Sequence, residues 1–129
     1  MTKTKEQLKA EVKVLKAAYE EVLNQYNATQ EVINENAAVI KAVRVEFNLR
    51  KDVNNQYTID ELDDLIMDTE DGEETGFELS ALEEAFNNVK EAVASIETNN
   101  TELERISYAL SNKNIELQDM KDKVRYYKG

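Results

Sequence analysis

Proline is absent from this chain of 129 residues, and its three glycines are Gly72, Gly76 and Gly129. Proline and glycine are the residues that most strongly interrupt helices. A chain nearly free of both can form long, uninterrupted helices. Charged residues make up 33% of the chain, which is typical of long helices with solvent-exposed faces. We therefore expect an all-α protein.

The first part of the chain carries a sustained heptad pattern. A row of residues at alternating steps of four and three runs from Leu8 to Phe47, and it includes the polar residues Thr29 and Asn36. This spacing places the row on one face of a helix, as in coiled coils. A polar residue in such a row either selects register and partner number or marks an imperfect core edge. We predict a first long helical arm over residues 3–47.

The last part of the chain carries a similar pattern in two stretches. The first apolar row contains Leu79, Leu82, Phe86, Val89, Val93 and Ile96. A second row runs from Leu103 to Tyr127, and the spacing between the two rows shortens around Asn99. Such a shortening accompanies either a break or a locally overwound continuous helix. We predict a second long helical arm over residues 80–127 and leave both alternatives open for residues 98–101.

The middle of the chain, residues 48–79, lacks the heptad. Thr58 followed by Glu61 is a capping box and predicts the start of a short helix over residues 59–68. Ser80 with Glu83 predicts the start of the final arm in the same way. The expected architecture is one domain, residues 1–129. It comprises two long coiled-coil-type helices with a small acidic helical head between them. The arms form either a helical hairpin or an intermolecular coiled coil.

The net charge of −11 is concentrated in the head. Residues 52–84 contain thirteen Asp and Glu and no Lys or Arg, whereas residues 1–51 carry +2 and residues 85–129 are neutral. Like charges at this density destabilise a compact structure. The cluster therefore either binds a basic partner or is a solvated face that keeps the protein soluble. The predicted partner-binding residues are Asp60, Glu61, Asp63, Asp64, Asp68, Glu70, Asp71, Glu73 and Glu74.

The apolar rows of the arms also need partners, because an apolar stripe is stable only when it packs against another. We expect a homo-oligomer for this reason. The residues predicted to mediate self-association are Leu8, Val12, Leu15, Tyr19, Val22, Tyr26, Ile33, Ile40, Leu103, Ile106, Leu110 and Leu117.

The absence of cysteine and histidine excludes disulfides, thiolate ligands and histidine bases, so we expect no enzyme and no cofactor. A calcium loop beginning at Asp71 would place Leu82 where a bidentate Glu is required, so no metal site is predicted. Basic residues beside Tyr126 and Tyr127 suit a helix C-terminus, and direct nucleic-acid binding is not expected. No apolar run is long enough for a membrane span, so the expected location is the cytoplasm.

The layout of two matched arms, residues 3–47 and 80–127, resembles that of prefoldin subunits in architecture. The middle departs from that family because it lacks the strand hairpins through which prefoldins assemble. The size and acidity also resemble those of small bacteriophage accessory proteins, which include scaffolding, head-core and tail-assembly proteins and inhibitors of host nucleases. This second resemblance implies a location in the host cytoplasm or the virion.

Two functions follow from these features. The first is a structural or assembly protein that self-associates through its arms and docks its acidic head onto a basic surface of a larger protein. The second is an acidic inhibitor whose head mimics nucleic-acid charge and occupies the channel of a host nucleic-acid-binding protein or nuclease.

Overall fold

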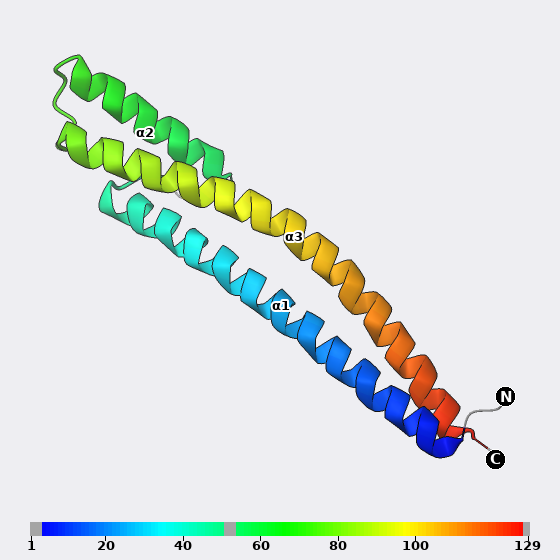
Figure 1. Cartoon of the computed structure of the whole chain (residues 1–129). Coiled ribbons are helices and arrows are strands. Elements are labelled where there is room, and N and C mark those ends of the chain that lie inside the picture. The colour runs from blue at the N-terminus through cyan, green and yellow to red at the C-terminus, as the bar shows by residue number, and fades with distance from the viewer. Residues whose placement is uncertain (1–3, 51–53, 128–129) are drawn as a thin grey trace. The chain divides into compact units, whose positions relative to one another are not determined.

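The computed structural model describes residues 4–50 and 54–127, which form three helices (Figure 1). They are α1 (Lys5–Glu46), α2 (Asn55–Glu70) and α3 (Leu79–Arg125), of 42, 16 and 47 residues. No strand occurs within the described ranges. The predicted all-α fold, with two long helices and a short one between them, is confirmed. The first position of the predicted first arm, Lys3, lies outside the described residues.

The chain divides into two compact units. We call residues 31–100 the three-helix unit, because α2 and parts of α1 and α3 form it. We call residues 1–30 with 101–129 the terminal unit, because it is formed by the two ends of the chain. The expectation of a single domain stays a prediction.

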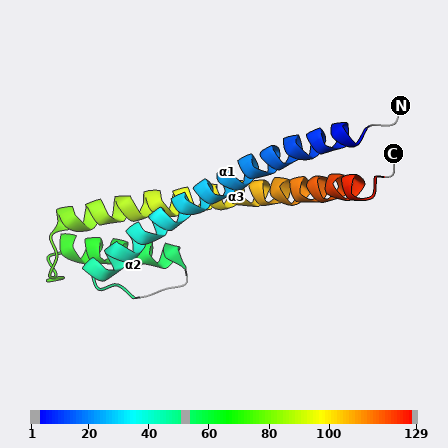
Figure 2. The same ribbon diagram turned by 90° about the horizontal axis from the view of Figure 1, so that it is seen from below.

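The three-helix unit has its own apolar core, to which all three helices contribute. Figures 1 and 2 both show α2 beside the first part of α3. The buried core residues are Ile40, Val43, Phe47, Leu62, Leu82, Ala85, Val89 and Ala92. Several of these side chains are fully enclosed, and Leu62, Leu82 and Val89 are each 0% exposed. Burial of this apolar surface stabilises the unit without any other chain.

α3 is one continuous helix through residues 98–101, so the alternative of a break is excluded. The buried row contains Ala85 and Ala92 where the sequence analysis had chosen the bulkier Phe86 and Val93. With the two alanines, the steps of three and four continue without a shortening. The shortened spacing near Asn99 appeared in the sequence because the bulkier residue was assigned to the buried row at each turn. Close helix packing instead buries small residues at the contact.

The caps predicted for α2 and α3 at Thr58 and Ser80 are wrong, because both helices begin earlier. Asn54, not Thr58, caps α2, and its side-chain Oδ1 accepts a hydrogen bond from the backbone N of Gln56 at 3.0 Å. α2 therefore begins at Asn55 and ends at Glu70, beyond both ends of the predicted 59–68. α3 begins at Leu79, which places Ser80 inside the first turn. Asparagine is at least as good an N-cap as threonine, and an earlier cap takes precedence when the following residues are helix-compatible.

The start of α1 is a capping box that the sequence analysis missed. Thr4 Oγ1 accepts from the backbone N of Gln7 at 3.2 Å, and Gln7 Oε1 accepts from the backbone N of Thr4 at 2.9 Å. Each side chain thus satisfies one backbone N–H at the helix start, where no intrahelical acceptor exists.

Two of the helix ends are closed by a residue in the left-handed conformation. Asn48 follows α1 with φ 54°, and Leu49 N donates to Arg44 O at 2.8 Å. Gly72 follows α2 with φ 85°, and Glu73 N donates to Asp68 O at 2.9 Å. Both ends have the Schellman pattern, in which these bonds satisfy the last helical carbonyls.

The connection between α2 and α3 is anchored at two points. Thr69 Oγ1 and Thr75 Oγ1 lie 2.9 Å apart and share a hydrogen bond. The Phe77 ring packs edge to face against the Phe47 ring, with centroids 4.9 Å apart. The connection therefore packs onto the ends of α1 and α2.

The terminal unit contains two helical segments that run in opposite directions, the start of α1 and the end of α3 (Figure 1). Among its described residues, the buried apolar side chains are Leu8, Ile106 and Leu117. The other members of its apolar rows are half-buried. Two helices thus cover these rows less completely than three helices cover the core of the other unit.

Candidate interaction surfaces

α2 has an apolar and a charged side. Thr58 and Leu62, four residues apart, are 1% and 0% exposed and face the core of the three-helix unit. Ile59, Leu65 and Ile66 pack partly buried against that core. This spacing leaves the remaining helix face toward solvent. The packing of α2 therefore determines which acidic residues are exposed.

Seven of the nine predicted partner-binding residues are exposed, and we call them the acidic face. They are Asp60, Asp63, Asp64, Glu70, Asp71, Glu73 and Glu74. The first four lie at helical spacing on the outer side of α2, and the others follow in the connection to α3. Asp68 and Glu61 are half-buried. The structure thus places most of the predicted set on the exposed side of α2 and in the connection that follows it.

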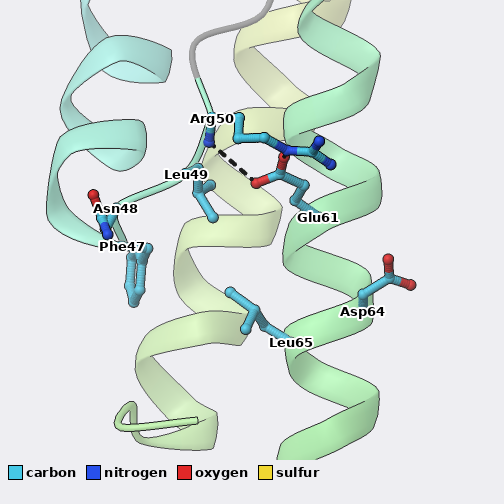
Figure 3. Close-up of a pocket in the computed structure, with 7 residues that line it drawn as sticks. All are labelled: Phe47, Asn48, Leu49, Arg50, Glu61, Asp64 and Leu65. Atoms are coloured by element: carbon cyan, nitrogen blue, oxygen red, sulfur yellow. Dashed lines mark hydrogen bonds and ion pairs between the residues drawn. The ribbon is translucent and has the colours of Figure 1, made fainter.

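Glu61 differs from the rest because it already has a cationic partner. Arg50 Nε lies 3.0 Å from Glu61 Oε1, and the backbone N of Arg50 donates to Glu61 Oε2 at 3.3 Å (Figure 3). The Arg50 guanidinium also stacks over the Tyr57 ring, 4.7 Å from its centroid. Glu61 borders a pocket of about 300 Å³ that Phe47, Leu49 and other residues line. Its role is to hold the segment after α1 against α2, so we exclude it from the acidic face.

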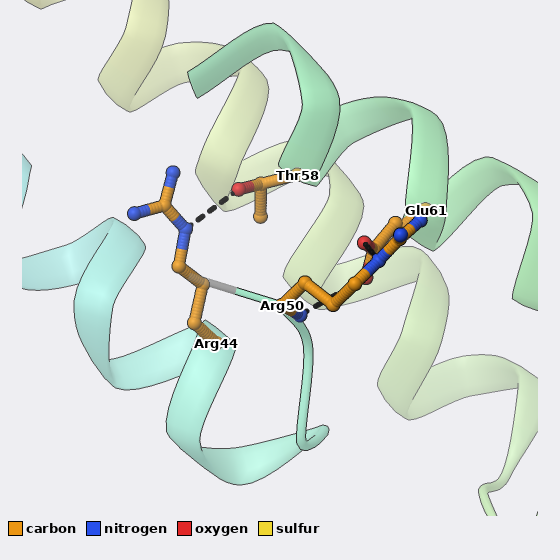
Figure 4. Close-up of polar contacts among 4 residues, drawn as sticks. All are labelled: Arg44, Arg50, Thr58 and Glu61. Carbon is orange, nitrogen blue, oxygen red and sulfur yellow. Dashed lines mark hydrogen bonds and ion pairs between the residues drawn. The ribbon is translucent and has the colours of Figure 1, made fainter. Parts of the chain in front are cut away.

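Arg44 makes a second polar contact between α1 and α2. Its Nε donates to Thr58 Oγ1 at 2.7 Å, and its Nη2 donates to Asn55 Oδ1 at 3.1 Å (Figure 4). A buried hydroxyl without a partner is costly, so this guanidinium supports the burial of Thr58. The sequence analysis missed Arg44 because it belongs to the first arm. The signal available in the sequence was a cation in the last turn of the first arm.

The acidic face is also electrostatically unfavourable for α2 itself. Glu70, Asp71, Glu73 and Glu74 cluster at the C-terminal end of the helix, and its last turn contains no basic residue. A helix C-terminus carries partial negative charge, which repels anions. Docking of a basic surface would remove this repulsion.

The described residues contain no group of three or more acidic side chains arranged to hold a metal ion. The segment from Asp71 to Gly76 closes α2 through a Schellman turn.

A polar layer joins α1 and α3 inside the three-helix unit. Ser95 Oγ accepts from Asn36 Nδ2 at 3.0 Å and from Asn99 Nδ2 at 3.2 Å. Asn36 Nδ2 also donates to Val32 O at 2.9 Å, and Asn99 Nδ2 to Ser95 O at 2.8 Å. Asn36 and Asn99 both lie in the heptad rows of their helices. These hydrogen bonds therefore favour one register of α1 against α3.

The terminal unit holds most of the residues predicted to mediate self-association. In that unit, Leu8, Ile106 and Leu117 are buried within the chain, and the other seven are half-buried: Val12, Leu15, Tyr19, Val22, Tyr26, Leu103 and Leu110. Ile33 and Ile40 belong instead to the three-helix unit, where Ile40 is 1% exposed. The half-buried residues keep apolar surface that another molecule could cover.

Glu102 and Arg105 form an exposed ion pair on α3 in the terminal unit. Arg105 Nε donates to Glu102 Oε2 at 3.2 Å, and Nη2 contacts Oε1. This hydrogen bonding lowers the pKa of Glu102 and raises the pKa of Arg105. Both side chains are exposed, so solvent screens the pair and it adds little stability.

Comparison with protein-family models, with curated proteins and with solved structures gives no significant match for this chain. The resemblances to prefoldin subunits and to bacteriophage accessory proteins therefore rest on layout and composition. No helix within residues 4–50 and 54–127 combines the length and the apolar character that crossing a membrane requires.

Proposed function

We propose that this protein is a non-enzymatic assembly protein. It self-associates through the terminal unit and docks onto a basic surface of a larger protein through the acidic face. The observation that carries the proposal is the incomplete burial of the apolar rows in the terminal unit, beside the fully enclosed core of the three-helix unit.

The contrast between the two units supports self-association. Two helices bury an apolar row only on the sides that face each other, whereas three or four helices can enclose it on all sides. In the terminal unit, Val14, Tyr108 and Ile115 are 69%, 75% and 56% exposed in addition to the half-buried rows. Covering such surface with a second copy releases it from water, which favours association.

The geometry of α2 supports docking by the acidic face. The cations Arg44 and Arg50 contact the first half of α2 at Asn55, Thr58 and Glu61. Six exposed acidic residues follow those contacts along the chain: Asp63, Asp64, Glu70, Asp71, Glu73 and Glu74. A basic partner would bring complementary charge and speed encounter by electrostatic steering.

Sedimentation equilibrium over a wide range of concentrations tests self-association. We expect the wild type to form dimers or larger species, and Val14→Asn to weaken them because it places an amide on an exposed apolar site. The matched control is Met67→Asn, since Met67 is 54% exposed but lies on α2. A wild type that stays monomeric throughout would contradict the proposal.

Capture with a charge-matched control tests docking. One variant combines Asp60→Asn, Asp63→Asn, Asp64→Asn and Glu70→Gln, which leaves Glu61 and its contacts intact. The control combines Glu31→Gln, Glu35→Gln, Glu46→Gln and Glu91→Gln, which make the same change in net charge at exposed positions of α1 and α3. We expect the α2 variant alone to lose a partner that the wild type retains from bacterial lysate at low salt. Equal retention by both variants would contradict docking through the acidic face.

A second candidate function is inhibition by mimicry of nucleic-acid charge. It is favoured by the outward acidic residues at helical spacing along α2, which present a row of negative charges. Such an inhibitor would displace DNA from a host nuclease, and its binding would weaken steeply with salt. Nuclease inhibition that persists in the α2 variant, or that is insensitive to salt, would exclude this function.

A further inference from the structure

Charge is segregated along the terminal unit. The segments 4–16 and 113–127 together contain eight Lys and Arg and five Asp and Glu, a net +3. The segments 17–30 and 101–112 together contain one Arg and four Glu, a net −3. We call them the basic half and the acidic half of the unit. The described residues of the terminal unit thus have no net charge, but their positive and negative charges are separated along the length of the unit.

The two segments of the basic half contact one another. Ala10, Glu11, Val14 and Leu15 of α1 and Met120 of α3 line one groove of about 400 Å³. The groove is apolar, apart from Glu11, and Val14 on its wall is 69% exposed. Tyr108, in the acidic half, is 75% exposed. Both halves therefore carry uncovered apolar side chains.

We propose that two copies of this chain pair antiparallel through their terminal units, so that the basic half of each lies against the acidic half of the other. This inference rests on the self-association proposed above and specifies its geometry. The two-fold axis passes near the points where the charge changes sign, between Lys16 and Ala17 on α1 and between Asn112 and Lys113 on α3.

Electrostatics select this direction over a parallel pair. A parallel pair aligns +3 with +3 and −3 with −3, and like charges in register across an interface are strongly unfavourable. An antiparallel pair aligns the basic half of each copy with the acidic half of the other copy. Screening limits these interactions to about 8 Å at physiological salt, so only charges lining the interface contribute. In a two-fold pair both copies use the same surface, so none of that surface stays free for a third copy. Assembly through this surface therefore stops at the dimer.

Distances between spin labels test the direction, and the absence of native cysteine makes single labelling sites simple to introduce. Ser111→Cys lies near the axis and Tyr126→Cys lies near the end of α3; both positions are exposed. In an antiparallel pair the Ser111→Cys labels lie within about 20 Å and the Tyr126→Cys labels about 40 Å apart. Short distances at both positions would establish a parallel pair and overturn the inference.

Charge reversal with rescue is the second test. Lys9→Glu with Lys13→Glu changes the basic half from +3 to −1, and adding Glu20→Lys with Glu21→Lys changes the acidic half from −3 to +1. We expect the first pair of substitutions to raise the dimer Kd at low salt at least about tenfold, and the second pair to restore most of the loss. A parallel pair predicts the opposite for the first variant, since it relieves repulsion between basic halves.

The outcomes separate this inference from the proposed function. A chain that sediments as a monomer contradicts both. A chain that associates with short distances at Ser111→Cys and Tyr126→Cys keeps the proposed function and overturns the antiparallel pair. Growth beyond dimers through contact of the acidic face with the basic half would also overturn it. The expected result is a dimer with a short distance between the Ser111→Cys labels and a long distance between the Tyr126→Cys labels. Lys9→Glu with Lys13→Glu weakens this dimer.

Discussion

At the residue scale, the polar positions in the apolar rows determine how α1 and α3 align. The sequence analysis left open whether Asn36 sets the register or marks a core edge. In the structure it donates to Ser95 Oγ, which also accepts from Asn99, so three polar side chains satisfy one another between the helices. A one-turn slip would separate these groups while leaving apolar residues opposite one another. The polar layer therefore specifies register more than it adds stability.

Substitution of Ser95 tests this layer. Ser95→Ala removes the acceptor shared by Asn36 and Asn99, but each amide keeps its backbone acceptor. We expect a loss of about 1 kcal/mol in the free energy of unfolding, measured by urea denaturation. Ser107→Ala, at an exposed position of α3, is the control and should change it little. Equal effects of the two substitutions would show that the layer contributes nothing.

At the element scale, α2 is held by cations from outside its own segment. Residues 52–84 contain no Lys or Arg, so sequence reasoning treated the head as wholly acidic. Arg44, near the end of α1, contacts Thr58, and Arg50, in the segment after α1, contacts Glu61. Only packing of α2 against α1 brings these residues together. Pairwise contacts between elements are the information that the local pattern lacks.

The two arginines should contribute unequally. Arg44→Met leaves the buried hydroxyl of Thr58 without its donor, and we expect a loss of about 1–3 kcal/mol in the free energy of unfolding. Arg50→Met removes an ion pair whose arginine is 75% exposed, and we expect a loss of about 1 kcal/mol or less. Thermal and urea unfolding would measure both. A larger effect at Arg50 than at Arg44 would contradict this assignment.

The acidic end of α2 should be less stable than a neutral one. Asp71→Asn removes a negative charge at the helix C-terminus, and we expect a gain of about 0.3–1 kcal/mol that salt diminishes. Glu78→Gln, immediately before the start of α3, removes a charge from a helix N-terminus and should have the opposite sign. Urea denaturation at low and high salt distinguishes the two. A gain at both positions would indicate general charge repulsion without a helix-end effect.

At the scale of the whole molecule, the long helices followed from the sequence, and their local details did not. The absence of proline and the apolar rows that begin at Leu8, Leu79 and Leu103 predicted α1 and α3 to within two residues at their ends. The cap at Asn54 was missed because the capping-box pattern of Thr58 and Glu61 was the more complete signal in the sequence. The burial of Ala85 and Ala92 was missed because a small residue does not stand out before its packing partner is known. Of the nine residues predicted to bind a partner, the seven of the acidic face are exposed and Glu61 and Asp68 are half-buried, and their role in binding stays a prediction.

The three-helix unit encloses its core within one chain, and we propose that the terminal unit completes its core with another copy. Amide hydrogen exchange of the full chain at low and high protein concentration tests it directly. We predict that amides around Leu15, Tyr19 and Ile106 gain protection as concentration rises, while those around Leu62 and Val89 do not change. Protection of the terminal unit that is independent of concentration, or a gain in protection confined to the three-helix unit, would contradict this proposal.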